Sequence, residues 1–194
     1  APDDLPEPLF TMLKRHGEWV ESEGASGKPA SLANVDLRRI SGLAAYDLTA
    51  LLAPRATLYG CFLEGVRLQG AQLTGADLRG AKLKGADLRG INLKDARLSG
   101  ADLRDVNLGP LVIAGERLMP AQLGKADLRN CDLRGADLNH AGLAQSDLSF
   151  ANFTGANLRK TDLTGASLEG AVIPRDQLRE TLIDGEALAA LAGR

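Results

Sequence analysis

The chain has 194 residues and a formal net charge of −2, and only 4% of its residues are aromatic. This length suits one domain with a buried core, and the low aromatic content favours a narrow core over one built around large rings. The balanced charge gives no support for direct nucleic-acid binding, and no apolar run approaches the roughly 18 residues of a membrane span.

Residues 1–29 are predicted to form a capping helix and a linker. The opening residues lack the basic and apolar regions of a secretory signal. The stretch PEPLFTMLKRHGEWVESEG has prolines suited to a helix start and a glycine suited to its end. One face of this helix carries Leu9, Leu13, His16 and Val20. We expect this face to cover the first turn of the following domain, with Phe10 and Trp19 sealing it.

Residues 75–90 read GADLRGAKLKGADLRG, so alanine and leucine each recur every five residues. On an α-helix, five residues advance by roughly 140°, which would scatter the leucines around every side. On a straight strand, an odd spacing moves each successive leucine to the opposite face. The pattern therefore requires a chain that bends once per repeat, and it predicts a solenoid in which each unit packs on its neighbours.

The five-residue register runs from Leu43 to Ile173 without gaining or losing a residue. A small residue lies two positions before each leucine, and polar residues fill the other positions. We expect the small residue and the leucine to point inward and the polar residues to point outward. One extra residue between Leu37 and Leu43 predicts an irregular first turn.

The run at 75–90, with NCDLRGADLNHAGL and FANFTGANLRKTDLTGASL later in the chain, resembles the pentapeptide-repeat proteins. The resemblance covers residues 30–174. It implies an all-β solenoid, a right-handed, four-sided β-helix with one repeat per side and four repeats per turn. The sequence on either side predicts short helical caps at both ends.

Residues 109–120, GPLVIAGERLMP, interrupt the pattern. Leu111 replaces the small residue, and Glu116 would place an unpaired carboxylate in the apolar shaft, which is too costly. We therefore expect this segment to bulge outward. Two interpretations remain open: a recognition loop with Glu116 and Arg117 as contact residues, or a neutral insertion.

Residues 175–194 lose the repeat pattern but keep apolar positions, which favours short helices over the last turn. Leu188 and Leu191 belong to an Ala/Leu surface suited to contact with a second copy of the chain. We therefore expect a homodimer to form through the C-terminal end.

Outward residues of the repeats offer few chemical sites. Tyr59 and Phe62 either anchor a partner or lie beneath the N-terminal helix. Many aspartates precede the leucines, and arginines follow them, so ion pairs are favoured over a cation-binding ladder. Four of these aspartates are placed on one side of the solenoid, together with arginines: Asp47, Asp87, Asp127 and Asp147.

Neither the histidines nor the cysteines indicate catalysis or metal binding. His16 and His140 lie far apart in the sequence, outside any metal-spaced group. Cys61 and Cys131 take inward positions three and a half turns apart on this register, about 17 Å, which excludes a disulfide. Free buried thiols favour a reducing compartment, so we expect a cytoplasmic protein. We expect no catalytic residue, no metal and no cofactor.

Function is predicted more coarsely than fold. The resemblance implies one specific alternative, because some pentapeptide-repeat proteins mimic B-form DNA, bind gyrase and protect it from quinolones. Such mimicry requires a long acidic face, yet positions 43–173 hold 14 acidic and 15 basic residues. The leading prediction is a non-enzymatic structural scaffold or protein–protein interaction module with an unidentified protein partner.

Overall fold

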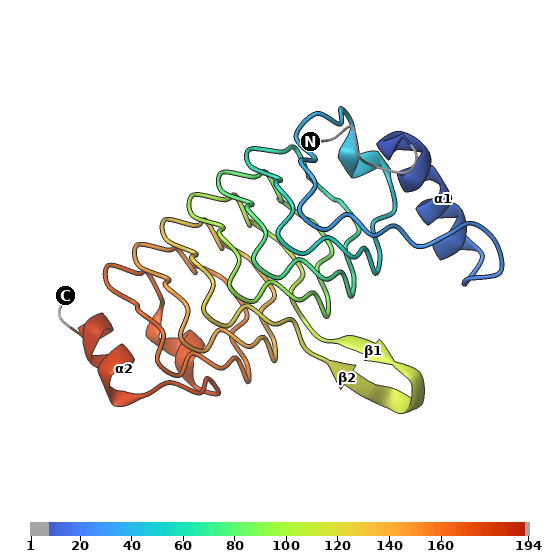
Figure 1. Ribbon diagram of the computed structural model, residues 1–194. Helices are drawn as coiled ribbons and strands as arrows, with labels where there is room; N and C mark the ends of the chain where they lie inside the picture. The colour runs from blue at the N-terminus through green and yellow to red at the C-terminus, as the bar shows by residue number, and fades with distance from the viewer. Residues whose placement is uncertain (1–7, 193–194) are drawn as a thin grey trace.

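The protein, seen in a computed structural model that describes residues 8–192, is a coil of stacked turns (Figure 1). In the regular turns, isolated parallel bridges join the residue before an inward leucine to the residue twenty positions later, as in Asp77 with Arg97 and Lys82 with Asp102. Each turn of the coil therefore contains four pentapeptides. The first turn is one residue longer, since Ser31 pairs with Leu52.

Each pentapeptide bends at a corner whose backbone has a positive φ. In the repeat at 76–80, Ala76 and Leu78 are buried, and Gly80 forms the corner with φ of 64°. The amide of Ala81 donates to the carbonyl of Leu78 at 3.0 Å and closes the bend. Glycine takes this conformation without steric cost, which explains its recurrence every five residues.

Hydrogen bonds between turns run along the axis of the coil. The amide of Leu78 donates to Arg97 O at 2.7 Å, and the amide of Asp77 donates to Ala56 O at 3.0 Å. The leucines form one continuous core. Leu78, Leu83, Leu88 and Leu93 are each only 1% exposed, so the prediction that they point inward is confirmed.

Helix α1 (Leu9–Glu21) lies at the N-terminal end of the coil (Figure 1). Leu13 and His16 are fully buried, so the predicted face does pack inward. The expectation that Phe10 and Trp19 seal the end is wrong for Phe10, which is 60% exposed, and Trp19 is only partly buried. Positions i, i+4 and i+7 form one stripe on a helix, so Leu9, Leu13 and His16 point towards the coil, whereas Phe10 lies beside this stripe in the first turn of α1 and faces outward.

The linker after α1 packs closely against the helix. The amide of Lys28 donates to Arg15 O at 3.0 Å. A Cβ atom at Gly27 would lie 2.3 Å from Arg15 O, so only glycine fits this position. The short 3₁₀ helix η2 (Leu43–Ala45) accommodates the irregular first turn.

A β-hairpin leaves the coil at residues 109–120 (Figure 1). Strand β1 (Leu111–Ile113) pairs antiparallel with β2 (Arg117–Met119), and η3 (Ala114–Glu116) joins them. Bridges that span the hairpin join residues 30 positions apart instead of 20, as in Asn92 with Gln122. The hairpin thus removes ten residues, or two pentapeptides, from the coil.

This removal corrects two predictions, because ten residues amount to half a turn. Asp47 and Asp87 share a column of bridges that continues to Asp137, whereas Asp127 and Asp147 belong to another column. The four aspartates therefore do not share one side. Cys61 and Cys131 are three turns apart, not three and a half, and about 14 Å still separates them.

The C-terminal end contains the 3₁₀ helix η4 (Arg175–Leu178) and the helix α2 (Gly185–Ala192). Between them the chain still follows the coil, since Asp162 bridges to Leu182. No helix within residues 8–192 is long and apolar enough to cross a membrane.

Candidate interaction surfaces

The inner ring of aliphatic residues is left open at the C-terminal end of the coil. The five-residue register continues past Ile173 to Leu178, Ile183 and Leu188. Ile173, Leu178 and Ile183 are only partly buried, and Leu188 is 48% exposed. The equivalent residues one turn earlier are at most 1% exposed: Phe153, Leu158, Leu163 and Leu168. These four inward-facing residues of the last turn therefore form the open C-terminal end of the apolar core.

Asp184 fixes α2 beside this opening. Its Oδ1 accepts a hydrogen bond from the Ala187 amide at 2.8 Å, and its Oδ2 accepts one from the Gly165 amide. These two backbone bonds lower the pKa of Asp184. A single carboxylate thus caps the start of α2 and ties the helix to the preceding turn of the coil.

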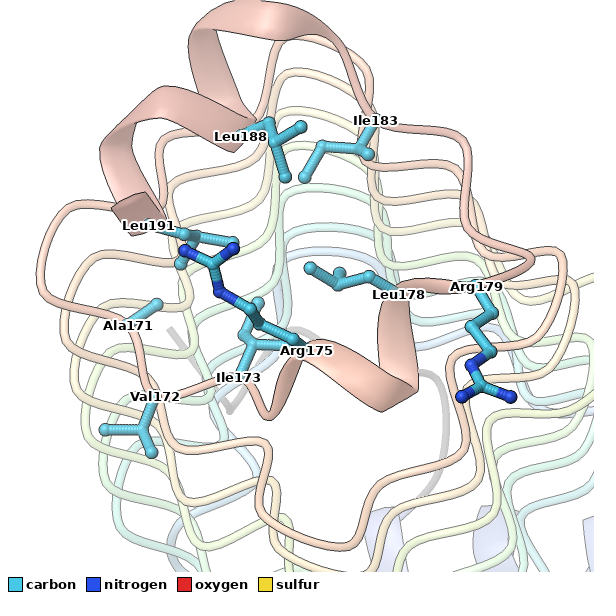
Figure 2. Close-up of a pocket in the computed structure, with 9 residues that line it drawn as sticks. All are labelled: Ala171, Val172, Ile173, Arg175, Leu178, Arg179, Ile183, Leu188 and Leu191. Atoms are coloured by element: carbon cyan, nitrogen blue, oxygen red, sulfur yellow. The ribbon is translucent and has the colours of Figure 1, made fainter. Parts of the chain in front are cut away.

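A cavity of about 660 Å³ lies between η4, α2 and the last turn. Figure 2 shows Leu178, Ile183, Leu188 and Leu191 around this space, with Arg175 extending across it towards Leu191. Arg179 points away from the aliphatic residues in the same view. A mostly apolar hollow with a few polar groups at its mouth has the character of a binding site.

The hairpin packs against the coil through one face and leaves the other open. Leu111 and Met119 cover the corner glycines Gly70 and Gly90, where added Cβ atoms would lie 3.4 Å and 2.8 Å from Met119 Cε. On the outer face Val112 is 65% exposed and Leu118 is 49% exposed. These two residues are directly paired across the strands, so they form one small apolar patch.

Glu116 and Arg117 lie at the exposed end of this hairpin, where the sequence predicted contact residues. Glu116 has a φ of 61° and does not enter the shaft. Val112 and Leu118 were not among the predicted contact residues, although they alternate with the inward Leu111 and Met119 as expected for a half-buried strand pair.

Tyr59 and Phe62 lie on either side of the corner at Gly60. Tyr59 is 51% exposed and Phe62 is 76% exposed, which excludes the expectation that α1 covers them. The guanidinium of Arg79 lies 5.3 Å from the centroid of the Tyr59 ring and forms a cation–π contact. Both rings remain candidate anchors for a partner.

The outer sides of the coil carry ion pairs formed within single repeats. In the repeat at 101–105, the guanidinium of Arg104 donates to both carboxylate oxygens of Asp102 at 2.8 and 2.7 Å. These side-chain bonds lower the pKa of Asp102. The same pairing with Arg38 lowers the pKa of Asp36 to about 2. The Asp-Leu-Arg sequence therefore neutralises its own carboxylate.

The surroundings of the two cysteines indicate structural roles. Cys131 is buried, its Sγ lies 3.1 Å from Leu98 O, and burial raises the pKa of this thiol to about 12. Burial also raises the pKa of the Cys61 thiol. In the described part of the chain, no three His, Cys, Asp or Glu residues group closely enough to hold a metal ion.

The structure brings some of the predicted site residues together and separates others. Leu188 and Leu191 line one cavity, Tyr59 and Phe62 flank one corner, and the hairpin tip is a third location. Ile173, Leu178 and Ile183, which line the same cavity, were not predicted site residues. Their continued spacing of five from Leu168 is the signal that could have identified them.

Comparisons with known proteins agree with this architecture. A family model for pentapeptide repeats matches in eight copies over residues 55–90, 71–109, 118–149 and 141–173. A search of curated proteins gave no match.

Several solved structures are similar. The pentapeptide-repeat protein Rfr23 from the cyanobacterium Cyanothece is 24% identical, with 75% of this chain and 86% of that chain covered and a TM-score of 0.48. HetL, a pentapeptide-repeat protein of Nostoc involved in heterocyst differentiation regulation, is 26% identical, with 85% and 93% covered and a TM-score of 0.31. QnrB1, a plasmid-mediated fluoroquinolone resistance protein, is 17% identical, with 84% and 96% covered and a TM-score of 0.24. The family model spans more than half of the sequence, and the chain therefore belongs to the pentapeptide-repeat family.

Proposed function

We propose that this protein is a non-enzymatic scaffold that binds other proteins through the ends and projections of a rigid coil. We further infer that the coil is a right-handed, four-sided β-helix with α1 and the C-terminal helices as its caps. Twenty-residue spacing between bridged residues supports four sides. The free thiols of Cys131, which is buried, and of Cys61, which is partly buried, support a reducing compartment such as the cytoplasm.

The open aliphatic ring at the C-terminal end carries this proposal. Ile173, Leu178, Ile183 and Leu188 occupy positions that are buried in every complete turn, yet here they line a 660 Å³ cavity. Burying apolar surface is favourable by about 25 cal/mol for each Å² removed from water, so covering this end of the coil would lower its free energy. At the other end, by contrast, Leu13 and His16 of α1 are both 0% exposed.

The partner we propose for this end is a second copy of the chain. Two C-terminal ends that meet around a two-fold axis would each bury the other's Leu188 and Leu191 in one isologous contact. The Ala/Leu surface of α2 suits close packing of a helix against its symmetry mate. The ion pairs on the sides give less reason to associate, because exposed pairs contribute little.

The test is the solution mass of the parent protein and of three variants, measured by light scattering. Leu188→Glu should convert a dimer into a monomer, because it places a charge at the centre of the contact. Leu182→Glu is the matched control, since Leu182 is 62% exposed but does not line the cavity. The control should stay dimeric, and deletion of residues 186–194 should give a monomer.

A monomeric full chain would contradict the dimer, as would a Leu188→Glu variant that remains dimeric. Thermal melting of each variant separates loss of contact from loss of folding. A monomer that melts like the parent protein supports the proposal, since only the association has changed.

The resemblance to gyrase-binding proteins offers a second function, but the charges do not favour it. DNA mimicry would require a run of unpaired carboxylates along one side. Here the aspartates of several turns are held by arginines of the same repeat, including Asp77, Asp87, Asp102, Asp127 and Asp132.

A further inference from the structure

His16 joins α1 to the start of the coil through a single, well-defined hydrogen bond. Its Nδ1 accepts the backbone N–H of Ala30 at 3.1 Å, and the whole residue is buried. Because Nδ1 acts as the acceptor, the neutral ring carries its proton on Nε2. Nε2 is also buried, and it has no hydrogen-bond partner among the described residues.

The groups around His16 offer little compensation for a positive charge. On α1, the Trp19 ring stacks on the imidazole with centroids 5.8 Å apart. Burial lowers the pKa of His16, and on the coil the backbone of Thr49 and the carboxylate of Asp47 raise it by less. Asp47 already pairs with Arg67 at 2.5 Å and accepts the Thr49 amide at 3.0 Å. Its charge is therefore largely balanced.

Protonation would turn the contact with the linker from attractive to repulsive. An imidazolium carries N–H groups on both nitrogens, so Nδ1–H would face the Ala30 N–H that it binds in the neutral form. A buried cation would also lose its hydration. The first turn of the coil includes Leu32 and Leu37, which are both 0% exposed when α1 is in place.

We infer that His16 is a pH-sensitive latch whose protonation releases α1 and opens the N-terminal end of the coil. Near pH 7 the neutral ring holds α1 against the linker, and the apolar ring of the first turn stays covered. In acid, α1 detaches and the coil has two open ends instead of one. This inference does not depend on the partner proposed for the C-terminal end.

The direction of the pH dependence follows from the environment of the ring. Burial lowers the pKa of His16 below its ordinary value of 6.5. The docked state of α1 is therefore most stable above about pH 6.5, where the imidazole is neutral in both the released and the docked forms. Below that pH the released form binds a proton more readily than the docked form. Each further pH unit weakens the latch by up to about tenfold, until the docked ring also titrates.

The experiment measures hydrogen exchange in α1 and the NMR titration of the two histidines between pH 8 and 4.5. We expect the protection of the α1 amides, corrected for intrinsic exchange, to fall by up to tenfold per pH unit below 6.5. The amides of the central turns should keep their protection. Trp19, the only tryptophan, should become solvent-exposed over the same pH range, which its fluorescence reports.

Two variants make the assignment specific. His16→Asn keeps an acceptor close to the position of Nδ1 but cannot be protonated, so its α1 should stay protected in acid. His140→Asn removes the other histidine and should leave the transition unchanged.

The inference is overturned by any of three results. One is α1 protection that does not change with pH in the parent protein. Another is an acid transition that persists in His16→Asn. The third is an NMR pKa for His16 at or above 6.5, a measurement that needs no variant to fold.

Discussion

The corner residue of each pentapeptide adopts the same left-handed conformation whether or not it is glycine. Asp95, Lys125 and Phe150 have φ values of 57°, 59° and 60°, close to the 65° of Gly90. A side chain in this region costs about 1 kcal/mol or more, so the inward residues must supply the stability that holds these corners. Strained corners therefore occur along the whole coil, and the buried leucines provide the apolar contacts that stabilise it.

Leu88 provides a direct test of this dependence, since it is 1% exposed in the middle of the core. Leu88→Asp would place a carboxylate where no described donor faces it, and we expect it to lower the free energy of unfolding by more than about 4 kcal/mol. Lys84→Asp introduces the same side chain at an exposed position in the same turn and should change stability little. Urea denaturation of both variants measures the difference, and equal stabilities would mean that Leu88 is not a core residue.

At the scale of elements, the hairpin was predictable only in part. Glu116 and the flanking prolines indicated a bulge, but nothing local specified two paired strands. What fixes the hairpin is a long-range contact, because Leu111 and Met119 pack over Gly70 and Gly90 from earlier turns. Sequence spacing alone could not reveal this contact. For the same reason it misplaced the aspartates, since the half-turn that the hairpin removes appears only when the bridges are traced.

Two glycine variants test the docking of the hairpin. Gly80 and Gly90 have nearly the same φ, 64° and 65°, so alanine costs about 1 kcal/mol of backbone strain at either corner. At Gly90 the new Cβ would also lie 2.8 Å from Leu111 Cβ, whereas at Gly80 nothing lies within 4 Å. We expect Gly90→Ala to cost about 1 to 3 kcal/mol more than Gly80→Ala and to speed proteolysis within the hairpin. Equal costs would show that the hairpin does not rest on the coil in solution.

At the scale of the whole molecule, the four columns of bridged residues decide whether the coil can present a DNA-like charge pattern. Three columns contain Asp-Leu-Arg repeats, in which Arg79, Arg89, Arg104 and Arg129 neutralise carboxylates of their own repeats. One of these three columns mixes both charges with neutral amides, since it runs from Asp47 through Arg67, Asp87 and Asn107 to Asp137. The fourth is largely uncharged and includes Leu52, Gln72, Asn92, Gln122 and Gly142. No side within the described residues therefore offers the regular line of negative charge that DNA presents, about one for every 1.7 Å of its axis.

We accordingly expect no inhibition of gyrase supercoiling at low micromolar protein. QnrB1 run in the same assay controls for the activity of the enzyme. A triple variant that removes the paired arginines, Arg79→Gln, Arg104→Gln and Arg129→Gln, probes the cause, because it frees carboxylates on two sides. If charge pairing is what prevents mimicry, this variant should bind gyrase more strongly than the parent chain does. Specific inhibition by the parent chain at the same concentrations would refute the argument, since it would show that gyrase recognises this coil without a continuous acidic side.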